Sequence, residues 1–181
     1  MKLIILDRDG VINEDSDDYI KSPAEFIPIP GSLEAIARLN AAGYRVVVAS
    51  NQSGIARGLF TKTTLDAIHA KLNRLLSEVG GKVDEIFFCP HGPNDGCNCR
   101  KPNPGLLHEI GRAYEVDLHD TVVIGDSLRD LQAAQTVGAR AVLVRTGKGM
   151  LTLTKCTGLE GIPVYDSLAA YVNHLLGTGS D

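Results

Sequence analysis

The amino-acid sequence predicts an α/β fold, in which a doubly wound, Rossmann-like parallel sheet carries helices on both faces. Short runs of β-branched and aliphatic residues alternate with amphipathic stretches along the chain. These short runs are apolar throughout, as is typical of strands that are buried on both faces. Regular alternation of strands and helices implies right-handed crossovers within one open sheet.

Five strands are predicted from the apolar runs, at residues 3–6, 45–49, 85–88, 121–124 and 141–144. Five helices are predicted from the apolar spacing, at residues 32–42, 61–79, 104–114, 128–137 and 166–176. Gly43 stands where the first helix would need a C-terminal cap. A chain of 181 residues without a repeat or long linker predicts a single domain over residues 1–181, with fraying expected only at 177–181.

The composition is that of an ordinary soluble protein, with 44% hydrophobic and 22% charged residues. A net charge of −4 argues against nucleic acid or an anionic membrane as a partner. No apolar run approaches the roughly 18 residues that span a bilayer. The apolar stretch at the start of the chain ends at the charged residue Asp7, so it is too short for a signal peptide. We therefore expect a cytoplasmic protein, and a monomer, because no apolar helix face requires a partner.

Carboxylates follow the first and fourth predicted strands, and the carboxyl ends of such strands meet in one crevice. Asp7 and Asp9 lie in the stretch D-R-D-G, and Asp126 follows the fourth strand. Asp7 could attack phosphorus if Mg²⁺ offsets the charge repulsion, while Asp9 would protonate the leaving alkoxide and later activate water. Gly10 permits the turn that brings both acids inward. When D-R-D-G is considered without the other motifs, an acidic turn exposed to solvent explains it equally well.

The remaining polar groups near the strand ends suit a phosphoryl group, although each has a plainer interpretation. Ser50 could bind phosphoryl oxygens or simply form a turn. Lys101 offers a point charge, and Arg100 could bind a second anion through two parallel hydrogen bonds. An adjacent Arg-Lys pair, however, is usually an ordinary part of the protein surface. Asp126 could complete the magnesium site with Asp7 and a backbone carbonyl, for which Asp9 is the candidate, or it could cap a helix. Asp130 could orient Lys101 or cap that helix.

Three cysteines and one histidine are concentrated in the segment C-P-H-G-P-N-D-G-C-N-C, residues 89–99. Cys89, His91, Cys97 and Cys99 form a typical tetrahedral Zn²⁺ ligand set, in which no position is left for a substrate, so the role would be structural. A disulfide, inert thiols or a catalytic thiol are the alternatives. Cys156 has no partner in the sequence and is expected in the core or at the surface. The zinc loop would also fix the two cations that follow it directly.

Taken in order, D-R-D-G, a serine after the second strand, a lysine, and G-D-x-x-x-D resemble the motifs of the haloacid dehalogenase-like phosphatase superfamily, over residues 2–146. The resemblance implies a phospho-aspartate mechanism without a large cap domain. Asp7 would be the nucleophile and Asp9 the acid/base, and Ser50 and Lys101 would clamp the phosphoryl group. Mg²⁺ would be bound by Asp7, Asp9 and Asp126.

Within the superfamily, D-R-D-G-V-I-N, S-N-Q-S-G-I-A-R-G and C-x-H…C-x-C-R-K-P are similar to the heptose-bisphosphate phosphatase family. The resemblance implies a small sugar bisphosphate as substrate, D-glycero-D-manno-heptose 1,7-bisphosphate, with loss of its C7 phosphate. Both anomers stay open: by resemblance the α anomer serves nucleotide-activated heptose and the β anomer lipopolysaccharide synthesis, and we favour β. The resemblance also implies that a set of polar residues contacts the substrate: Asp15, Ser16, Asp17, Asp18, Asn51, Gln52, Ser53 and Arg100. Arg100 would hold the C1 phosphate or nearby hydroxyls.

Other functions remain open at this stage. Histidinol-phosphate phosphatases share the zinc loop and the R-K-P element. A polynucleotide 3′-phosphatase would need a basic groove, which the acidic pI of about 5.7 disfavours. A zinc-binding interaction module without activity is the third alternative. The acidic run D-S-D-D, residues 15–18, suits a doubly anionic substrate only if it binds hydroxyls.

Overall fold

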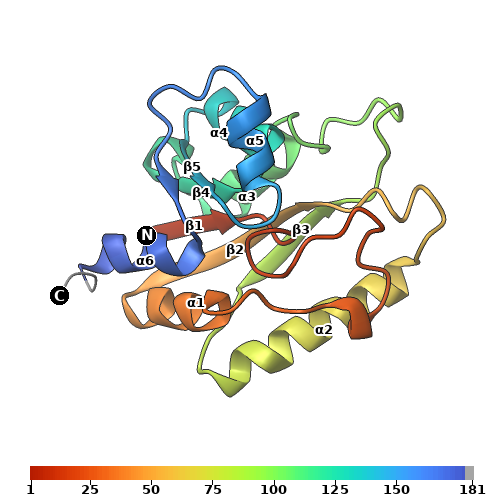
Figure 1. Ribbon diagram of the computed structural model, residues 1–181, viewed down its shortest axis with the longest axis horizontal. Coiled ribbons are helices and arrows are strands. Elements are labelled where there is room, and N and C mark those ends of the chain that lie inside the picture. The colour runs from red at the N-terminus through yellow and green to blue at the C-terminus, as the bar shows by residue number, and fades with distance from the viewer. Residues whose placement is uncertain (178–181) are drawn as a thin grey trace.

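The computed structural model describes residues 1–177 and contains one parallel sheet with the strand order β3-β2-β1-β4-β5-β6 (Figure 1). The strands are β1 (Lys2–Leu6), β2 (Tyr44–Asn51), β3 (Glu85–Cys89), β4 (Val122–Gly125), β5 (Arg140–Val144) and β6 (Val164–Tyr165). Every pairing between neighbouring strands is parallel. The predicted doubly wound α/β fold is therefore confirmed.

The helices alternate with the strands along the chain. They are α1 (Ser32–Ala41), α2 (Lys62–Glu78), α3 (Gly105–Tyr114), α4 (Leu128–Thr136), α5 (Gly149–Lys155) and α6 (Leu168–Leu176), with short 3-10 turns η1 (Pro23–Glu25) and η2 (Leu118–Asp120). The five predicted strands and five predicted helices agree with these bounds to within a few residues. β6 and α5 were not predicted, because two and seven residues are too few to show a period.

The predicted fraying at 177–181 falls almost wholly outside the described residues. Gly177 is described, and it ends α6 with a left-handed φ of 69°. Residues 178–181 lie outside the part of the chain that the structure describes.

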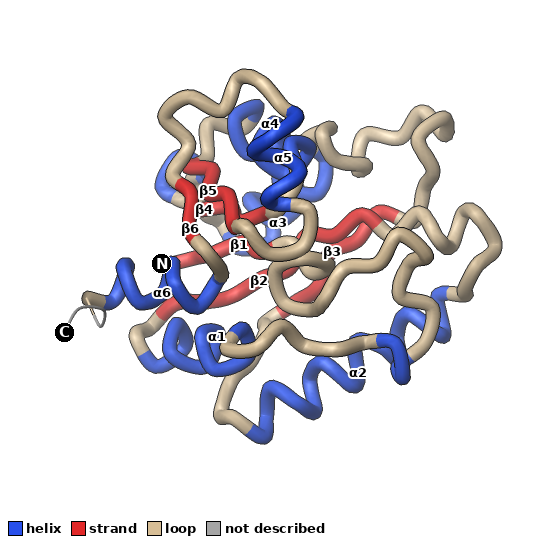
Figure 2. The backbone as a smooth tube through the Cα atoms, in the orientation of Figure 1, coloured by secondary structure: helices blue, strands red, loops and turns tan. Residues whose placement is uncertain are grey.

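Two apolar cores lie on opposite faces of the sheet (Figure 2). Alternate residues of β1 point into different cores, with Ile4 and Leu6 in one and Leu3 and Ile5 in the other. The first core is covered by α1, α2 and α6, and the second by α3 and α4, with α5 packed at its margin. Burial on both faces explains why the strands read as continuous apolar runs.

The order of the strands fixes where a ligand can bind. From β1 the chain proceeds outward to β2 and β3, and then returns to β4 on the other side of β1. Helices therefore leave β1 and β4 in opposite directions, and a crevice opens at the carboxyl ends of these two strands. Within residues 1–177, no segment forms a large domain over this crevice (Figure 1). No helix in that range is long and apolar enough to span a membrane.

Candidate active site

A cavity of about 300 Å³ lies at the carboxyl ends of the central strands. Of the residues predicted for catalysis, magnesium or substrate, all but Ser50 and Asp18 line it. Ser50 is almost fully buried and accepts a hydrogen bond from the Gln52 side-chain amide at 2.8 Å. The backbone N–H of Asp18 donates to Ser16 Oγ at 3.1 Å. The structure thus places Ser50 behind the cavity wall and Asp18 outside it.

The nucleophile candidate Asp7 continues the hydrogen bonding of β1, since its backbone N–H donates to the Ile124 carbonyl at 2.9 Å. Its Oδ1 accepts from the Arg8 backbone N–H at 2.9 Å and from Lys101 Nζ at 3.2 Å. Both of these hydrogen bonds end on the same oxygen, so the lone pairs of Oδ2 remain for a phosphorus atom or a cation. The sheet itself therefore positions this carboxylate.

Three carboxylates, those of Asp7, Asp126 and Asp130, place one oxygen each within 4.8 Å of one another. Burial, together with the negative charge of Asp130, raises the pKa of Asp7 to about 7. Burial and the charge of Asp7 raise the pKa of Asp126 to about 9. Burial and the mutual repulsion of the carboxylates both disfavour their ionised forms, and a bound cation would offset both. Hard carboxylate oxygens with excess negative charge fit a divalent cation such as Mg²⁺.

The composition of this carboxylate cluster differs from the predicted magnesium set in one member. Among residues 1–177, the cluster includes Asp130 and leaves out the carboxylate of Asp9. The Asp130 side chain, however, is already bonded to Lys101 and Ser127. Asp7 and Asp126 are thus the two side chains best placed for the ion, and the contribution expected from Asp9 is its backbone carbonyl, not its carboxylate.

Asp126 is held in place by a segment that the sequence analysis did not assign, the start of α5. The Lys148 backbone N–H donates to Asp126 Oδ2 at 2.8 Å, and Thr152 Oγ1 donates to the Asp126 carbonyl at 2.8 Å. Gly10 has a φ of 86°, and a Cβ atom there would overlap the Asp126 carboxylate. A Cβ atom at Gly147 would overlap the same carboxylate and the Cα atom of Gly10. The glycine of D-R-D-G is therefore required for close packing as well as for the turn.

Lys101 is buried, and each of its three ammonium protons has an acceptor. Its Nζ donates to Asp130 Oδ1 at 2.6 Å, to the Ala49 carbonyl at 2.7 Å and to Asp7 Oδ1 at 3.2 Å. Burial by itself would lower the pKa of Lys101, but the charges of Asp130 and Asp7 outweigh burial and raise it. The ammonium group is therefore fixed beside the nucleophile in its charged form.

Two amide side chains behave as supports in this structure. Asn51 Oδ1 accepts from the Lys101 backbone N–H at 3.0 Å, and Asn51 Nδ2 donates to the Lys101 carbonyl at 3.1 Å. Gln52 Nε2 donates to Asp9 Oδ2 at 3.1 Å. Both residues line the cavity as predicted, but their amides already bond to the Lys101 backbone and to the Asp9 carboxylate. Asp130 likewise performs both roles that were considered for it, since it also forms a capping box with Ser127 at the start of α4.

Asp9 is bound more tightly than Asp7. Its Oδ1 accepts from Arg8 Nη2 at 2.7 Å, from Arg8 Nε at 3.1 Å and from Asn13 Nδ2 at 2.9 Å. Burial would raise the pKa of Asp9, but the Arg8 charge and the hydrogen bonds from Asn13, Arg8 and Gln52 hold it below its ordinary value. The two acids of D-R-D-G therefore differ in their electrostatic surroundings: the pKa of Asp7 is raised, whereas that of Asp9 is lowered.

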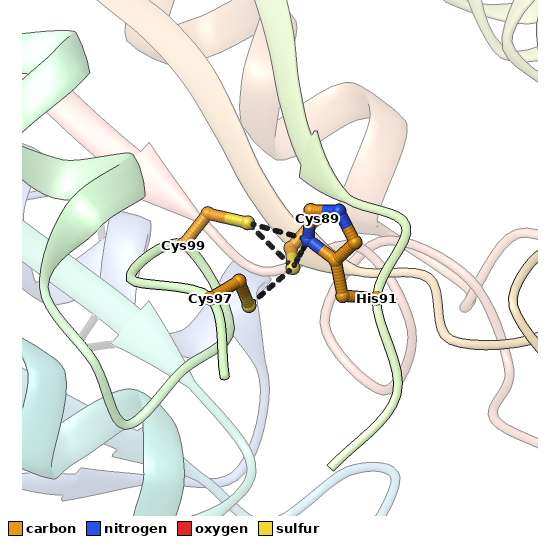
Figure 3. A group of neighbouring side chains, drawn as sticks. All are labelled: Cys89, His91, Cys97 and Cys99. Atoms are coloured by element: carbon orange, nitrogen blue, oxygen red, sulfur yellow. Dashed lines mark hydrogen bonds between the residues drawn. The ribbon is translucent and has the colours of Figure 1, made fainter. Parts of the chain in front are cut away.

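Cys89, His91, Cys97 and Cys99 converge at one point at the end of β3 (Figure 3). Cys89 Sγ lies 3.6 Å from Cys97 Sγ, and His91 Nδ1 lies 3.5 Å from Cys89 Sγ and 3.3 Å from Cys99 Sγ. A tetrahedral zinc ion with bonds of about 2.3 Å separates its sulfur ligands by roughly 3.8 Å. The Cys89 and Cys99 sulfurs, at 2.7 Å, would have to separate by about 1 Å to share such an ion.

The chemistry of the thiols agrees with a metal site. All four cysteines are free, so the disulfide alternative has no support. Burial opposes ionisation of Cys97, but hydrogen bonds from the Arg100 backbone and from neighbouring thiols outweigh it and lower its pKa to about 7. Three thiols and an imidazole leave no open position for a substrate. Cys156 lies elsewhere, half-buried at the C-terminal end of α5.

The cysteine loop is connected to the cavity through the residues that follow it. Arg100 Nη1 donates to the His91 carbonyl at 3.4 Å, and Asn103 Nδ2 donates to the Cys97 carbonyl at 2.9 Å. Arg100 lines the cavity, together with four side chains that the sequence analysis did not select: Tyr19, Arg57, Arg129 and Lys148. The signal for Arg57 was present, since it lies in the S-G-I-A-R-G run that carried the resemblance.

Comparisons with known proteins agree with this geometry. The HAD-hydrolase-like family model matches residues 98–171. The chain is 58% identical over 176 residues to the D-glycero-beta-D-manno-heptose-1,7-bisphosphate 7-phosphatase of Bordetella bronchiseptica, which covers 97% of this chain and 98% of that protein. It is also 58% identical to the enzyme of the same name from Pseudomonas aeruginosa, over 96% of this chain and 97% of that protein.

Solved structures give the same result. The crystal structure of D,D-heptose 1,7-bisphosphate phosphatase from B. bronchiseptica, complexed with magnesium and phosphate, superposes with a TM-score of 0.96 at 57% identity, over 99% of this chain and 100% of that one. The enzyme from Burkholderia thailandensis gives a TM-score of 0.78 at 49% identity, over 97% and 99%. The chain therefore belongs to the haloacid dehalogenase-like phosphatase superfamily and, within it, to the family of D,D-heptose 1,7-bisphosphate phosphatases.

Proposed function

We propose that this chain is a Mg²⁺-dependent phosphatase, active as a single-domain cytoplasmic monomer, that removes the C7 phosphate of D-glycero-β-D-manno-heptose 1,7-bisphosphate in lipopolysaccharide heptose synthesis. The observation that carries the proposal is the convergence of Asp7, Asp9, Lys101 and Asp126 on one cavity at the switch point of the sheet. Relatives of the same name over nearly the whole chain support the substrate.

In the first step, Asp7 attacks the phosphorus atom of the C7 phosphate, and the bond between phosphorus and the C7 oxygen breaks. Asp9 donates a proton to that oxygen, so the sugar leaves as an alcohol rather than as a strongly basic alkoxide. Lys101, held 3.2 Å from Asp7 Oδ1, balances negative charge on the transferring group. The product of this step is a phosphoryl group bonded to the Asp7 carboxylate.

In the second step, water attacks the phosphorus atom and Asp9 accepts the proton that this water loses. The bond between phosphorus and Asp7 breaks, which frees inorganic phosphate and restores the carboxylate. The lowered pKa of Asp9 in the free protein favours the ionised form that this step needs. A phosphate dianion next to Asp9 raises its pKa, which favours the protonated form that the first step needs.

Asp7 and Asp126 would hold the magnesium ion, together with the backbone carbonyl of Asp9. When bound, the ion supplies positive charge that screens the nucleophile from the phosphate and lowers the raised pKa of Asp7 into the ionised range. Cys89, His91, Cys97 and Cys99 would hold a structural zinc ion that fixes the direction of Arg100 and Lys101.

The charges around the cavity suit a substrate with two phosphates. The carboxylates and Lys101 surround the reacting end, whereas Arg57, Arg100 and Arg129 line the wall and can bind a second anion. Asp15, Ser16 and Asp17 line the cavity as well, where they can accept hydrogen bonds from sugar hydroxyls. We propose these contacts as the basis of substrate choice.

The test is phosphate release from the α and β anomers of heptose 1,7-bisphosphate and from histidinol phosphate, compared by kcat/KM with the same protein and with Mg²⁺ present. We expect the β anomer to be preferred and ³¹P spectra to show that the C1 phosphate remains. A higher kcat/KM with histidinol phosphate would show that this compound, and not heptose bisphosphate, is the substrate. Equally poor turnover of all three would remove the substrate assignment and leave the phosphatase chemistry standing.

A further inference from the structure

Arg8, between the two acids of D-R-D-G, has one of the largest fully buried side chains in the described structure, with 0% of its surface exposed. A buried guanidinium is costly unless it is paired and hydrogen-bonded. Arg8 makes charge-assisted hydrogen bonds to Asp9 Oδ1, and its guanidinium carbon lies 5.9 Å from the centre of the Phe26 ring. Its remaining terminal nitrogen, Nη1, lies 3.0 Å from Nε2 of His69.

His69 comes from the middle of α2, which is 61 residues away in sequence from Arg8. A guanidinium has hydrogen-bond donors and no acceptor, so His69 Nε2 must be the acceptor and the ring proton must be on Nδ1. Burial and the positive charge of Arg8 lower the pKa of His69 to about 4. His69 is therefore a neutral, fixed acceptor throughout the physiological pH range.

This chain of contacts decides which oxygen of Asp9 can exchange a proton. Oδ1 accepts three hydrogen bonds, two from Arg8 and one from Asn13. Among the described residues, Oδ2 accepts one, from Gln52 at 3.1 Å. An oxygen with three donors has no lone pair left for a leaving group or a water molecule. Oδ2 is consequently the oxygen that is free for proton transfer, and Asp9 lines the cavity.

We propose that His69 is a positioning residue for the reaction: through Arg8 it fixes the Asp9 carboxylate so that Oδ2 faces the phosphate. The inference rests on the proposed function, in which Asp9 moves the proton. His69 itself does not line the cavity and touches neither the substrate nor the reacting atoms. Without the acceptor on α2, Nη1 of Arg8 would be left unpaired, and the guanidinium could turn toward another acceptor and release Oδ1.

Three substitutions at this position separate acceptor geometry from packing. In His69→Gln, the side-chain oxygen can reach the place of Nε2 and accept from Arg8. His69→Leu keeps the volume and removes the acceptor, and His69→Asn has an acceptor that is too short to reach Arg8. His108→Leu, at an exposed position on α3, is the matched control. We expect kcat to fall at least about tenfold for Leu and Asn, with KM changed less than threefold, and to stay within threefold for Gln.

Comparison of two leaving groups provides a readout that a packing defect would not move. The leaving group of heptose bisphosphate is the strongly basic C7 oxygen of the sugar, which needs the proton from Asp9, whereas the leaving group of 4-nitrophenyl phosphate is a weakly basic phenolate, which does not. We expect His69→Leu and His69→Asn to lose several-fold more kcat/KM with the sugar phosphate than with the aryl phosphate. This ratio reports the steps up to phosphoryl transfer to Asp7, so it leaves out the second step, in which Asp9 serves both substrates alike. Asp9→Asn, measured alongside, should show the same selectivity in a stronger form.

Equal losses with both substrates, an unchanged kcat in His69→Asn, or a His69→Gln variant as slow as His69→Asn would each overturn the inference. If His69→Leu does not fold, the Gln and Asn variants still decide the question, because both keep a polar side chain at that position. The unmodified protein distinguishes the two proposals: its failure to release phosphate counts against the proposed function, whereas normal activity with unaffected variants counts against His69 alone.

Discussion

The two clusters of potential metal ligands in this chain are assembled in opposite ways. The carboxylate cluster collects Asp7 from the end of β1, Asp126 from the end of β4 and Asp130 from α4, so it exists only when the sheet is complete. The thiol cluster takes all its ligands from one continuous loop, which begins at Cys89 and ends at Cys99. The first has hard oxygen ligands and excess negative charge, and the second has a closed set of soft ligands.

This difference corresponds to two functions. Excess negative charge makes the carboxylate cluster sensitive to whatever cation or phosphate is bound, as catalysis requires. A closed tetrahedral set leaves no position for a substrate, so the thiol cluster can affect the reaction only by holding Arg100 and Lys101. The comparison predicts large effects on chemistry from the first cluster, and smaller, indirect effects from the second.

The largest effect is expected at the nucleophile. Asp7→Asn removes the group that forms the covalent intermediate while keeping its size, so kcat should fall by roughly 1,000-fold or more. The measurement is phosphate release from heptose bisphosphate at saturating Mg²⁺. Glu109→Gln, which neutralises an exposed acid on α3, is the control and should keep full activity. Comparable activity in both variants would show that the carboxylate cluster is not the reaction centre.

A smaller effect is expected from the thiol cluster. Cys99→Ser weakens the metal site next to Arg100, so kcat should fall about 10- to 100-fold and bound zinc, measured by elemental analysis, should decrease. The concentration of Mg²⁺ that gives half-maximal activity should change by less than about threefold, because the carboxylates are untouched. Cys156→Ser lies outside the cluster and should alter neither quantity. Loss of zinc with full activity would contradict the supporting role.

The charge of the carboxylate cluster predicts a pH dependence of stability. The pKa of Asp7 is raised from 3.8 to about 7 and that of Asp126 to about 9. Protonated carboxyls are favoured in the fold, so their stabilisation is complete below pH 3.8 and is lost as the pH rises through 7 and 9. Mg²⁺ binds the ionised forms, so the increase in Tm that it causes should grow between about pH 6 and 9.

Thermal denaturation with and without Mg²⁺ at several pH values measures this increase. The difference between the two curves removes contributions that the ion does not touch, such as that of His69. Each group can add at most about 1.4 kcal/mol per pH unit. Asp126→Asn should give a smaller and flatter response. A magnesium-induced shift that stays constant or declines toward pH 9 would show that these carboxylates are not its ligands.

The smallest effect is expected at the rim of the cavity. Lys148 Nζ lies 3.5 Å from Asp15 Oδ2, and the Lys148 side chain is 41% exposed. Exposed pairs of this kind contribute little, so Lys148→Met should raise KM by about threefold and leave kcat unchanged. Lys62→Met on α2, which removes another exposed ion pair, is the control and should change neither parameter. A large fall in kcat for Lys148→Met would show that this residue takes part in the reaction itself.

The same contrast explains how much the sequence could predict. The thiol cluster was predictable in full, because its ligands are neighbours in the chain. The carboxylate cluster was predictable because strands buried on both faces are easily recognised and their carboxyl ends must meet. The fold followed from the same apolar runs, apart from the short elements α5 and β6.

The parts that were missed depend on contacts between distant segments. Arg8 was passed over because a charged residue is expected at the surface, and its burial depends on His69 from α2. The role of Asn51 in holding Lys101 is equally invisible in the sequence, because 50 residues separate the two. The close packing at Gly147 could not be predicted, because the sequence does not show that the start of α5 lies against Asp126.

The central claim is that Asp7 becomes phosphorylated during turnover. The direct measurement is rapid acid quenching of the protein during turnover of heptose bisphosphate, followed by reduction of acyl phosphates with borohydride and mass spectrometry of the peptide that contains residues 2–10. We predict the reduced side chain at Asp7 in the unmodified protein and none in Asp7→Asn. Turnover at the full rate with Asp7 unmodified, or a phosphoryl group trapped on another residue, would contradict the account.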